Sequence, residues 1–169
     1  MTTFSLRTLR LRSGETYRDE QAIELEPLTL GGQRYLPVPG TVPGDFTVAR
    51  ASTGTVFELH FKARLHGPCY RCANDAVVEQ LVSAREYQAA TPGEAEELRT
   101  PYVVDDRLDL SAWARDALVL ALPGKILCRA DCAGLCPVCG GDLNVEWHDH
   151  DETPSDPRWA VLAELRDRL

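Results

Sequence analysis

Alternating apolar and polar positions along residues 55–65 form the clearest structural pattern in the chain. Every second position is apolar, namely Phe57, Leu59, Phe61, Ala63 and Leu65. Charged or polar side chains stand between them, so this period of two predicts a β-strand with one face in the core and one in solvent. Residues 46–50 precede it across Ser52-Thr53-Gly54, and together the two segments predict a hairpin.

The segments before this hairpin give weaker patterns. Residues 1–12 alternate in their second half, which favours a short strand with arginines on its polar face. Residues 21–30 predict another strand, although Pro27 weakens its second half. The stretch at 37–44 is rich in proline and glycine and predicts a loop.

A second hairpin is predicted after the first. Gly67-Pro68 ends the alternating strand, Cys69-Tyr70-Arg71-Cys72 follows, and residues 76–87 resume as a strand. This order places the Cys-x-x-Cys at the tip of the hairpin. Together the strands predict an antiparallel sheet, or an open barrel, over the first hundred residues.

The apolar spacing changes to that of a helix after Asp109, which offers an N-cap. Apolar residues follow at intervals of three and one: Leu110, Trp113, Ala114, Ala117, Leu118, Ala121 and Leu122. Pro123-Gly124 ends this helix, and residues 158–169 predict a short amphipathic helix at the C-terminus. The predicted class is α+β, with a sheet unit and packing helix in residues 1–125 and a Cys/His tail in 126–169.

The tail concentrates side chains that bind metal ions. Its candidate donors are Cys128, Cys132, Cys136, Cys139, His148 and His150. Pro137 and Gly140-Gly141 let the loop around the last two cysteines turn tightly, as in a zinc knuckle. A structural Zn²⁺ site takes four tetrahedral ligands, so six donors exceed the number required.

Two sets of ligands therefore compete. One is the four tail cysteines, and the other is Cys136 and Cys139 with His148 and His150. The second set departs from the spacing of a DNA-reading finger, which places its histidines three to five residues apart. No ordered base stands nearby, so we expect the zinc to be structural rather than catalytic.

Cys69 and Cys72 allow three interpretations: a redox pair, half of a zinc ribbon completed by Cys136 and Cys139, or residues with a local or partner-binding role. A thioredoxin-like dithiol stands between a strand and a helix, where the helix N-terminus lowers a thiol pKa. Here the pair joins two predicted strands, which disfavours redox catalysis.

The charge distribution separates the two ends of the chain. The net charge is −8, yet residues 1–18 carry Arg7, Arg10, Arg12 and Arg18 against the single acid Glu15. Residues 130–157 contain seven acids and no lysine or arginine. Phosphate binding needs positive charge, so the arginines are the candidate RNA contact and the tail is not.

The N-terminus lacks the apolar run of a signal peptide, and the longest apolar run, residues 117–122, is far shorter than a membrane span. We therefore expect a cytoplasmic protein with no membrane segment. In that compartment clustered cysteines are metal ligands or redox groups more often than disulfides.

Several motifs occur in a fixed order: Leu9 to Glu20, Cys69-Tyr70-Arg71-Cys72, Leu120-Ala121-Leu122-Pro123, Gly134-Leu135-Cys136-Pro137-x-Cys139-Gly140, and Asp156-Pro157-Arg158-Trp159-Ala160-x-Leu162. In this order the chain resembles the YceD family, the large ribosomal RNA subunit accumulation proteins of bacteria and plastids. Where many members have Cys-x-Cys after the knuckle, this chain has His148-Asp149-His150. Histidine is an equally good zinc ligand, so this departure supports ligation by the downstream pair.

The resemblance implies a cytosolic, non-enzymatic factor in the accumulation of large-subunit ribosomal RNA. Its partners would be that RNA or proteins of the large subunit, and family genes often lie beside the gene for a small zinc-ribbon protein of that subunit. Two other functions stay open: a zinc-stabilised interaction module without a ribosomal role, and a Cys-x-x-Cys thiol redox protein.

Overall fold

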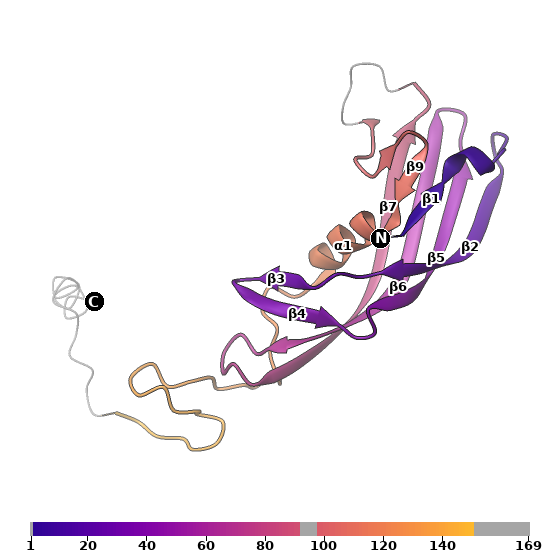
Figure 1. The fold of residues 1–169 in the computed structure, drawn as a ribbon. Helices are drawn as coiled ribbons and strands as arrows, with labels where there is room; N and C mark the ends of the chain where they lie inside the picture. The colour runs from indigo at the N-terminus through magenta and orange to yellow at the C-terminus, as the bar shows by residue number, and fades with distance from the viewer. Residues whose placement is uncertain (1, 92–97, 151–169) are drawn as a thin grey trace, which may run out of the picture.

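The computed structural model describes residues 2–91 and 98–150, and its largest element is an antiparallel sheet (Figure 1). The sheet consists of β2 (Thr16–Glu24), β3 (Leu28–Leu30), β4 (Gln33–Pro37), β5 (Thr41–Arg50), β6 (Gly54–Pro68) and β7 (Asp75–Ala89). The strand order is β2-β5-β6-β4-β3, and β7 pairs with β6. In the described residues, this antiparallel sheet with one α-helix agrees with the predicted α+β class.

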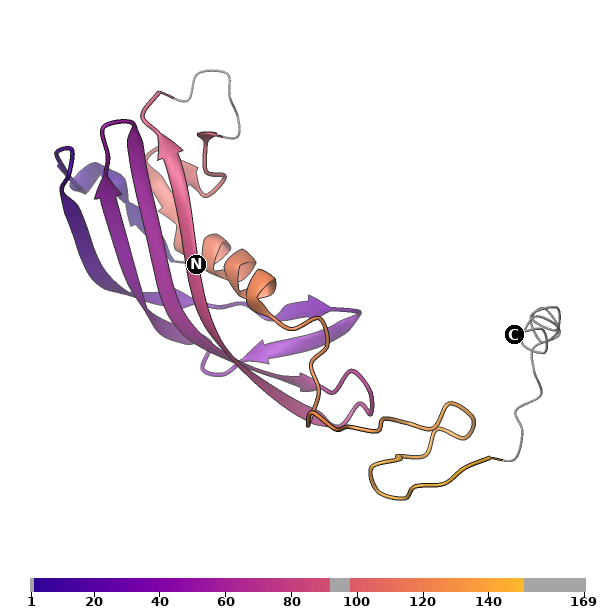
Figure 2. The ribbon, with the colours of Figure 1, turned by 180° about the vertical axis from the view of Figure 1, so that it is seen from behind.

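Strand β6 is the centre of this sheet. On one edge it pairs with β7 along its whole length, from Gly54 opposite Ala89 to Pro68 opposite Asp75. On the other edge it pairs first with β5 and then, near its end, with β4. The hairpin of β6 and β7 therefore extends past β5 toward the tail, as both views of the ribbon show (Figures 1 and 2).

The alternation predicted for β6 is confirmed. Its five apolar residues are buried: Phe57, Leu59, Phe61, Ala63 and Leu65. On the opposite face Lys62 forms an ion pair with Glu79 of β7, with 2.6 Å between Nζ and Oε2. One face of the strand thus builds the core and the other meets solvent.

The predicted helix is also confirmed, as α1 (Leu110–Ala121). The carboxylate of Asp109 accepts a hydrogen bond of 2.9 Å from the backbone N–H of Ala112, which is the expected N-cap. Leu110, Trp113 and Leu118 are buried in the same core as β6, so α1 covers the inner face of the sheet (Figure 2). No helix in the described part of the chain is long and apolar enough to cross a membrane.

The N-terminal prediction is only partly correct. β1 (Thr3–Ser5) is a strand, but a short 3₁₀ helix (Leu6–Thr8) follows it, and residues 9–12 alternate in exposure without forming a strand. The N–H of Leu6 bonds to the carbonyl of Asp106, and the leucines at 6, 9 and 11 pack against the core. β1 belongs to a small sheet of order β1-β9-β8, with β8 (Val103–Val104) and β9 (Arg107–Asp109).

Two further predictions need correction. The loop expected at 37–44 contains the end of β4 and the start of β5, because Val42 and Phe46 continue a buried alternation through Pro43 and Gly44. The strand expected at 21–30 is two strands, β2 and β3, separated by residues 25–27 around Pro27. The helix predicted at 158–169 lies outside the described residues.

Candidate metal centres

The structure divides the six predicted donors between two groups and adds two cysteines to the first. The four-cysteine group is Cys69, Cys72, Cys128 and Cys132, and the mixed group is Cys136, Cys139, His148 and His150. Within each group the donor atoms all lie within 4.8 Å of one another, so either group could hold a metal ion. The alternative set of four tail cysteines is thus split, whereas the Cys/His set comes together.

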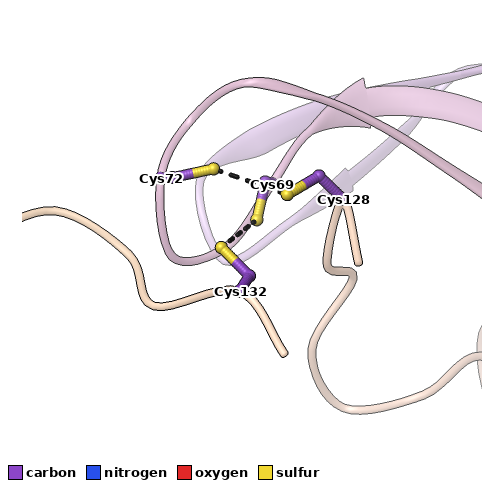
Figure 3. A group of neighbouring side chains, drawn as sticks. All are labelled: Cys69, Cys72, Cys128 and Cys132. Carbon is purple, nitrogen blue, oxygen red and sulfur yellow. Dashed lines mark hydrogen bonds between the residues drawn. The ribbon is translucent and has the colours of Figure 1, made fainter. Parts of the chain in front are cut away.

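The four-cysteine group lies where the tip of the β6–β7 hairpin meets the tail (Figure 3). The tip is a tight turn, in which the N–H of Cys69 bonds to the carbonyl of Asn74 and the N–H of Ala73 bonds back to Cys69. Ala73 takes a left-handed backbone conformation, with φ of 60°. This turn directs both cysteines of the pair toward the tail.

The tail reaches the hairpin tip through backbone contacts. The N–H of Tyr70 donates a 2.8 Å bond to the carbonyl of Ile126, and Ile126 is buried in the core. The guanidinium of Arg71 donates a 2.6 Å bond to the carbonyl of Cys132, and the N–H of Leu135 donates to the carbonyl of Arg71. These bonds hold Cys128 and Cys132 close to Cys69 and Cys72.

The four sulfurs are close but not bonded. The Sγ atoms of Cys69 and Cys132 are 3.8 Å apart, and those of Cys72 and Cys128 are 3.6 Å apart. A disulfide has an S–S bond of about 2.05 Å, and the cysteines are all free. Two polar hydrogens also point at sulfur, since the N–H of Arg71 donates to Cys69 and the side-chain amide of Asn144 donates to Cys132.

The surroundings set very different acidities within this group. Burial opposes ionisation of Cys69, but backbone N–H groups at Cys72, Arg71 and Cys128 outweigh it and lower the pKa of its thiol to about 6. Burial and the neighbouring sulfurs raise the pKa of Cys128 to about 12. Four thiolates side by side therefore require a cation, because only a positive charge offsets their repulsion.

The mixed group is built on the predicted knuckle. The N–H of Gly140 bonds to the carbonyl of Cys136, and the N–H of Cys136 bonds to the carbonyl of Gly141. Gly140 has φ of 75°, which glycine adopts without strain. Backbone N–H groups of Cys139 and Val138 lower the pKa of Cys136 to about 6, which favours a thiolate at neutral pH.

The two histidines are prepared for ligation in different ways. Nδ1 of His148 lies 3.1 Å from the carbonyl of Glu146, which can only accept, so Nδ1 carries the proton and Nε2 faces Cys139 at 3.1 Å. A carbonyl bound to the second ring nitrogen is typical of metal-ligating histidine. Nε2 of His150 is buried and has no hydrogen-bond partner among the residues described. A metal ion would satisfy that nitrogen.

The four candidate arginines do not form one patch. Arg7 pairs with Asp106 (3.3 Å, Nε to Oδ2), and Arg10 lines a cavity of about 410 Å³ together with Arg50. The backbone N–H of Arg12 bonds to the carboxylate of Glu15. Arg18 lies on the solvent face of the main sheet, beside acidic side chains of β5 and β6. Arg10 and Arg18 thus lie on opposite faces of the sheet.

Sequence reasoning left Cys69 and Cys72 with three interpretations, of which only the zinc ribbon made them metal ligands. The ribbon interpretation paired them with Cys136 and Cys139, but the structure places them beside Cys128 and Cys132 instead. A signal was present, because Cys69-x-x-Cys72 and Cys128-x3-Cys132 are two short cysteine pairs that together supply four donors.

Fold and site together define a protein with an antiparallel sheet and a cysteine-rich tail that offers two groups for metal ions. Residues 57–166, more than half of the chain, match the family described as "Large ribosomal RNA subunit accumulation protein YceD". The chain belongs to this family. The matched region contains all eight donor residues of both groups.

Relatives of the chain occur in mycobacteria. Uncharacterized proteins of Mycobacterium tuberculosis and Mycobacterium bovis are 37% identical over 126 residues, which is 72% of this chain and 60% of each relative. An uncharacterized protein of Mycobacterium leprae is 42% identical over 102 residues, 57% of this chain and 46% of that relative. The chain thus spans about three-fifths or less of the relatives' lengths. No solved structure matches it.

Proposed function

We propose that this protein is a non-enzymatic ribosome-biogenesis factor that supports accumulation of large-subunit ribosomal RNA in the cytoplasm. Membership of the YceD family supports the role. The donor sets support binding rather than catalysis, since each group has four protein ligands. Structural zinc sites use four protein ligands, whereas catalytic sites leave one position for water or substrate. This completeness of both sets is the observation that carries the proposal.

The mixed group of the tail is the first place where zinc would act. Two thiolates and two imidazoles suit Zn²⁺, and the orphaned Nε2 of His150 and the fixed tautomer of His148 fit such a ligand set. Bound zinc would order the knuckle, because this loop buries few apolar side chains that could order it otherwise. Its role in this proposal is structural.

The tail also offers a surface for a partner. Val145 and Trp147 are 85% and 77% exposed, and Leu135 and Val138 are exposed nearby. Because residues 130–157 contain seven acids and no lysine or arginine, this surface complements a basic protein rather than RNA. A basic protein of the large subunit is the partner that we propose for the tail.

The arginines at the other end of the chain are the proposed contact with ribosomal RNA. Arg10 and Arg50 line the same cavity at the end of the sheet, and Arg12 lies in the adjacent turn. Guanidinium groups bind phosphate in bidentate fashion, which suits RNA backbone. Arg18, surrounded by acids on the solvent face, contributes least to this contact.

A thiol redox function is the second candidate, and the low pKa of Cys69 is the observation in its favour. The burial of Cys69 argues against a redox function, because this residue is 0% exposed and a reactive thiol must be reached by its substrate. The pair also stands between two strands, without a helix N-terminus to stabilise a thiolate. A disulfide-reduction assay with the purified chain should give no turnover above free thiol.

The proposal is tested by deleting the gene and measuring the ratio of large-subunit to small-subunit ribosomal RNA. We expect the ratio to fall, and the intact gene to restore it. An unchanged ratio would contradict the proposed function. Affinity capture of the full chain separates it from an interaction module without a ribosomal role, because only the former recovers large-subunit components.

The two proposed surfaces are compared in the same strain. Arg10→Ala/Arg12→Ala and Trp147→Ser/Val145→Ser should each restore the ratio less well than the wild type. Arg115→Ala is the matched control, since Arg115 is exposed on α1 and forms an ion pair with the adjacent Asp116, far from both surfaces in sequence. Full restoration by either double variant would remove the corresponding surface from the proposal.

A further inference from the structure

We propose that Cys69, Cys72, Cys128 and Cys132 bind a zinc ion of their own, so that the chain carries two zinc ions. The first of these ions fastens the tail to the tip of the β6–β7 hairpin. This inference does not depend on a role in ribosomal RNA accumulation. It rests on the geometry, burial and connections of the four-cysteine group.

The spacing of the sulfurs fits a tetrahedral ion. With Zn–S bonds of about 2.3 Å, the edges of a ZnS₄ tetrahedron are about 3.8 Å long. Two of the sulfur pairs measure 3.8 Å and 3.6 Å, and they join Cys69 to Cys132 and Cys72 to Cys128 (Figure 3). Each pair therefore links the hairpin to the tail across an edge of the tetrahedron.

The group is also buried and supplied with donors to sulfur. Cys69, Cys72 and Cys132 are at most 4% exposed, and Cys128 closes the group from the solvent side. The N–H of Arg71 and the amide of Asn144 each point at a sulfur. Such N–H contacts stabilise thiolates, and the amide of Asn144 is itself held by the carboxylate of Asp142 at 2.6 Å.

The two groups are independent because they share no donor. Only Ala133, Gly134 and Leu135 separate Cys132 from Cys136, yet the two cysteines belong to different groups. Each group already has four ligands, which is the number that a structural zinc requires. Eight donors in two complete sets can hold two ions per chain, whereas the six tail donors alone suggested a single ion.

The proposed ion strengthens the contact between the hairpin tip and the tail, which otherwise depends on a few hydrogen bonds. Besides the bonds at Tyr70 and Arg71, the amide of Asn74 donates a 2.9 Å bond to the carboxylate of Asp142. Cys69 and Cys132 are 63 residues apart in sequence, so a shared ion would close a long loop and strongly restrict the chain. Zinc at the mixed group, by contrast, joins residues of the tail only to one another.

Native mass spectrometry of the full zinc-loaded chain counts the ions directly. We expect two zinc ions in the wild type, one in Cys69→Ser/Cys72→Ser and one in His148→Ala/His150→Ala. Tyr70→Phe is the matched control at the hairpin tip and should keep both ions. One ion in the wild type, or two in the Cys69/Cys72 variant, would overturn the proposal.

Hydrogen exchange then locates the effect of each loss. The Cys69/Cys72 variant should lose protection at the N–H groups of Tyr70 and Leu135, which bond across the junction. The His148/His150 variant should keep that protection and lose it at Cys136 and Gly140. Unchanged protection at the junction in the first variant would show that no ion fastens it.

A measurement on the unmodified chain covers the case in which the cysteine variant does not fold. Alkylation of the zinc-loaded protein should leave all six cysteines unmodified, although Cys128 and Cys139 are exposed. Removal of zinc by a chelator should then open them to alkylation. Modification of Cys128 in the loaded protein, or an intact mass lower by two hydrogens per disulfide, would overturn the assignment.

Discussion

Strand β6 buries apolar side chains, whereas the tail buries mainly cysteine thiols. In the sheet, Phe57 and Leu59 point inward against the core that Trp113 completes, and charged residues cover the other face. In residues 127–150 the buried side chains are the thiols of Cys132 and Cys136, and Trp147 lies in solvent. Apolar burial stabilises the sheet at about 25 cal/mol per Å². The tail buries little apolar area, so its order must come from ligated thiols and imidazoles.

Removing metal from the whole protein is the strongest way to break this comparison. Structural zinc contributes about 10–16 kcal/mol in zinc-finger peptides, so we expect a chelator to abolish amide protection throughout residues 127–150. Strands β2 to β7 should keep theirs, because most of their core consists of apolar side chains such as Phe57, Leu59 and Trp113. Hydrogen exchange followed by mass spectrometry gives both answers in one experiment. A tail that stays protected without metal would show that it has another source of order.

Core truncation should have the reverse effect. Trp113→Ala removes a side chain that is 2% exposed, and we expect it to lower the free energy of unfolding of the sheet by about 3–5 kcal/mol. Leu120→Ala, on the same helix but 87% exposed, is the control and should change it by less than about 0.5 kcal/mol. Urea titration followed by circular dichroism measures both. Equal losses in the two variants would contradict the assignment of the core.

The helix cap gives an intermediate effect confined to the sheet unit. Asp109→Ala removes the acceptor for the N–H of Ala112 and should cost about 1 kcal/mol of unfolding free energy. Asp109→Asn keeps a side-chain oxygen at that place and should cost less. Both variants should bind as much zinc as the wild type. A change in zinc content would mean that the helix and the tail are more closely coupled than their contacts indicate.

The smallest stability effect is expected at Trp147, an exposed aromatic residue in the described part of the tail. Trp147→Ser should alter protection of the knuckle amides by less than about 0.5 kcal/mol, because Trp147 is 77% exposed. The same substitution should weaken capture of a basic partner. This result would distinguish a partner-binding role of Trp147 from a role in stability. A large loss of knuckle protection would reveal an apolar cluster in the tail and weaken the contrast with the sheet.

Local patterns predicted the elements whose determinants are local. The period of two in β6 and the spacing after Asp109 specify a half-buried strand and a capped helix, and both are present. The start of β5 was missed because Pro43 and Gly44 resemble a turn, while pairing with β2 and β6 determines the outcome. The pairing partners of a strand cannot be predicted from the residues of that strand alone.

The candidate site shows the same division. Cys136, Cys139, His148 and His150 lie within one short stretch, and their spacing was enough to propose them as a set. Cys69 and Cys132 become neighbours only because the β6–β7 hairpin is long enough to reach the segment after α1. Sequence spacing marks the two cysteine pairs but does not show that they lie together, since their contact depends on the docking of two distant elements.

The long separation within the four-cysteine group also has a consequence for biosynthesis. Cys69 and Cys72 are synthesised before β7, β8, β9 and α1, and Cys128 and Cys132 are synthesised only afterwards. A nascent or truncated chain that ends before Cys128 therefore holds two of the four donors. Full occupancy of this group marks a chain whose sheet, helix and tail have all been synthesised and docked.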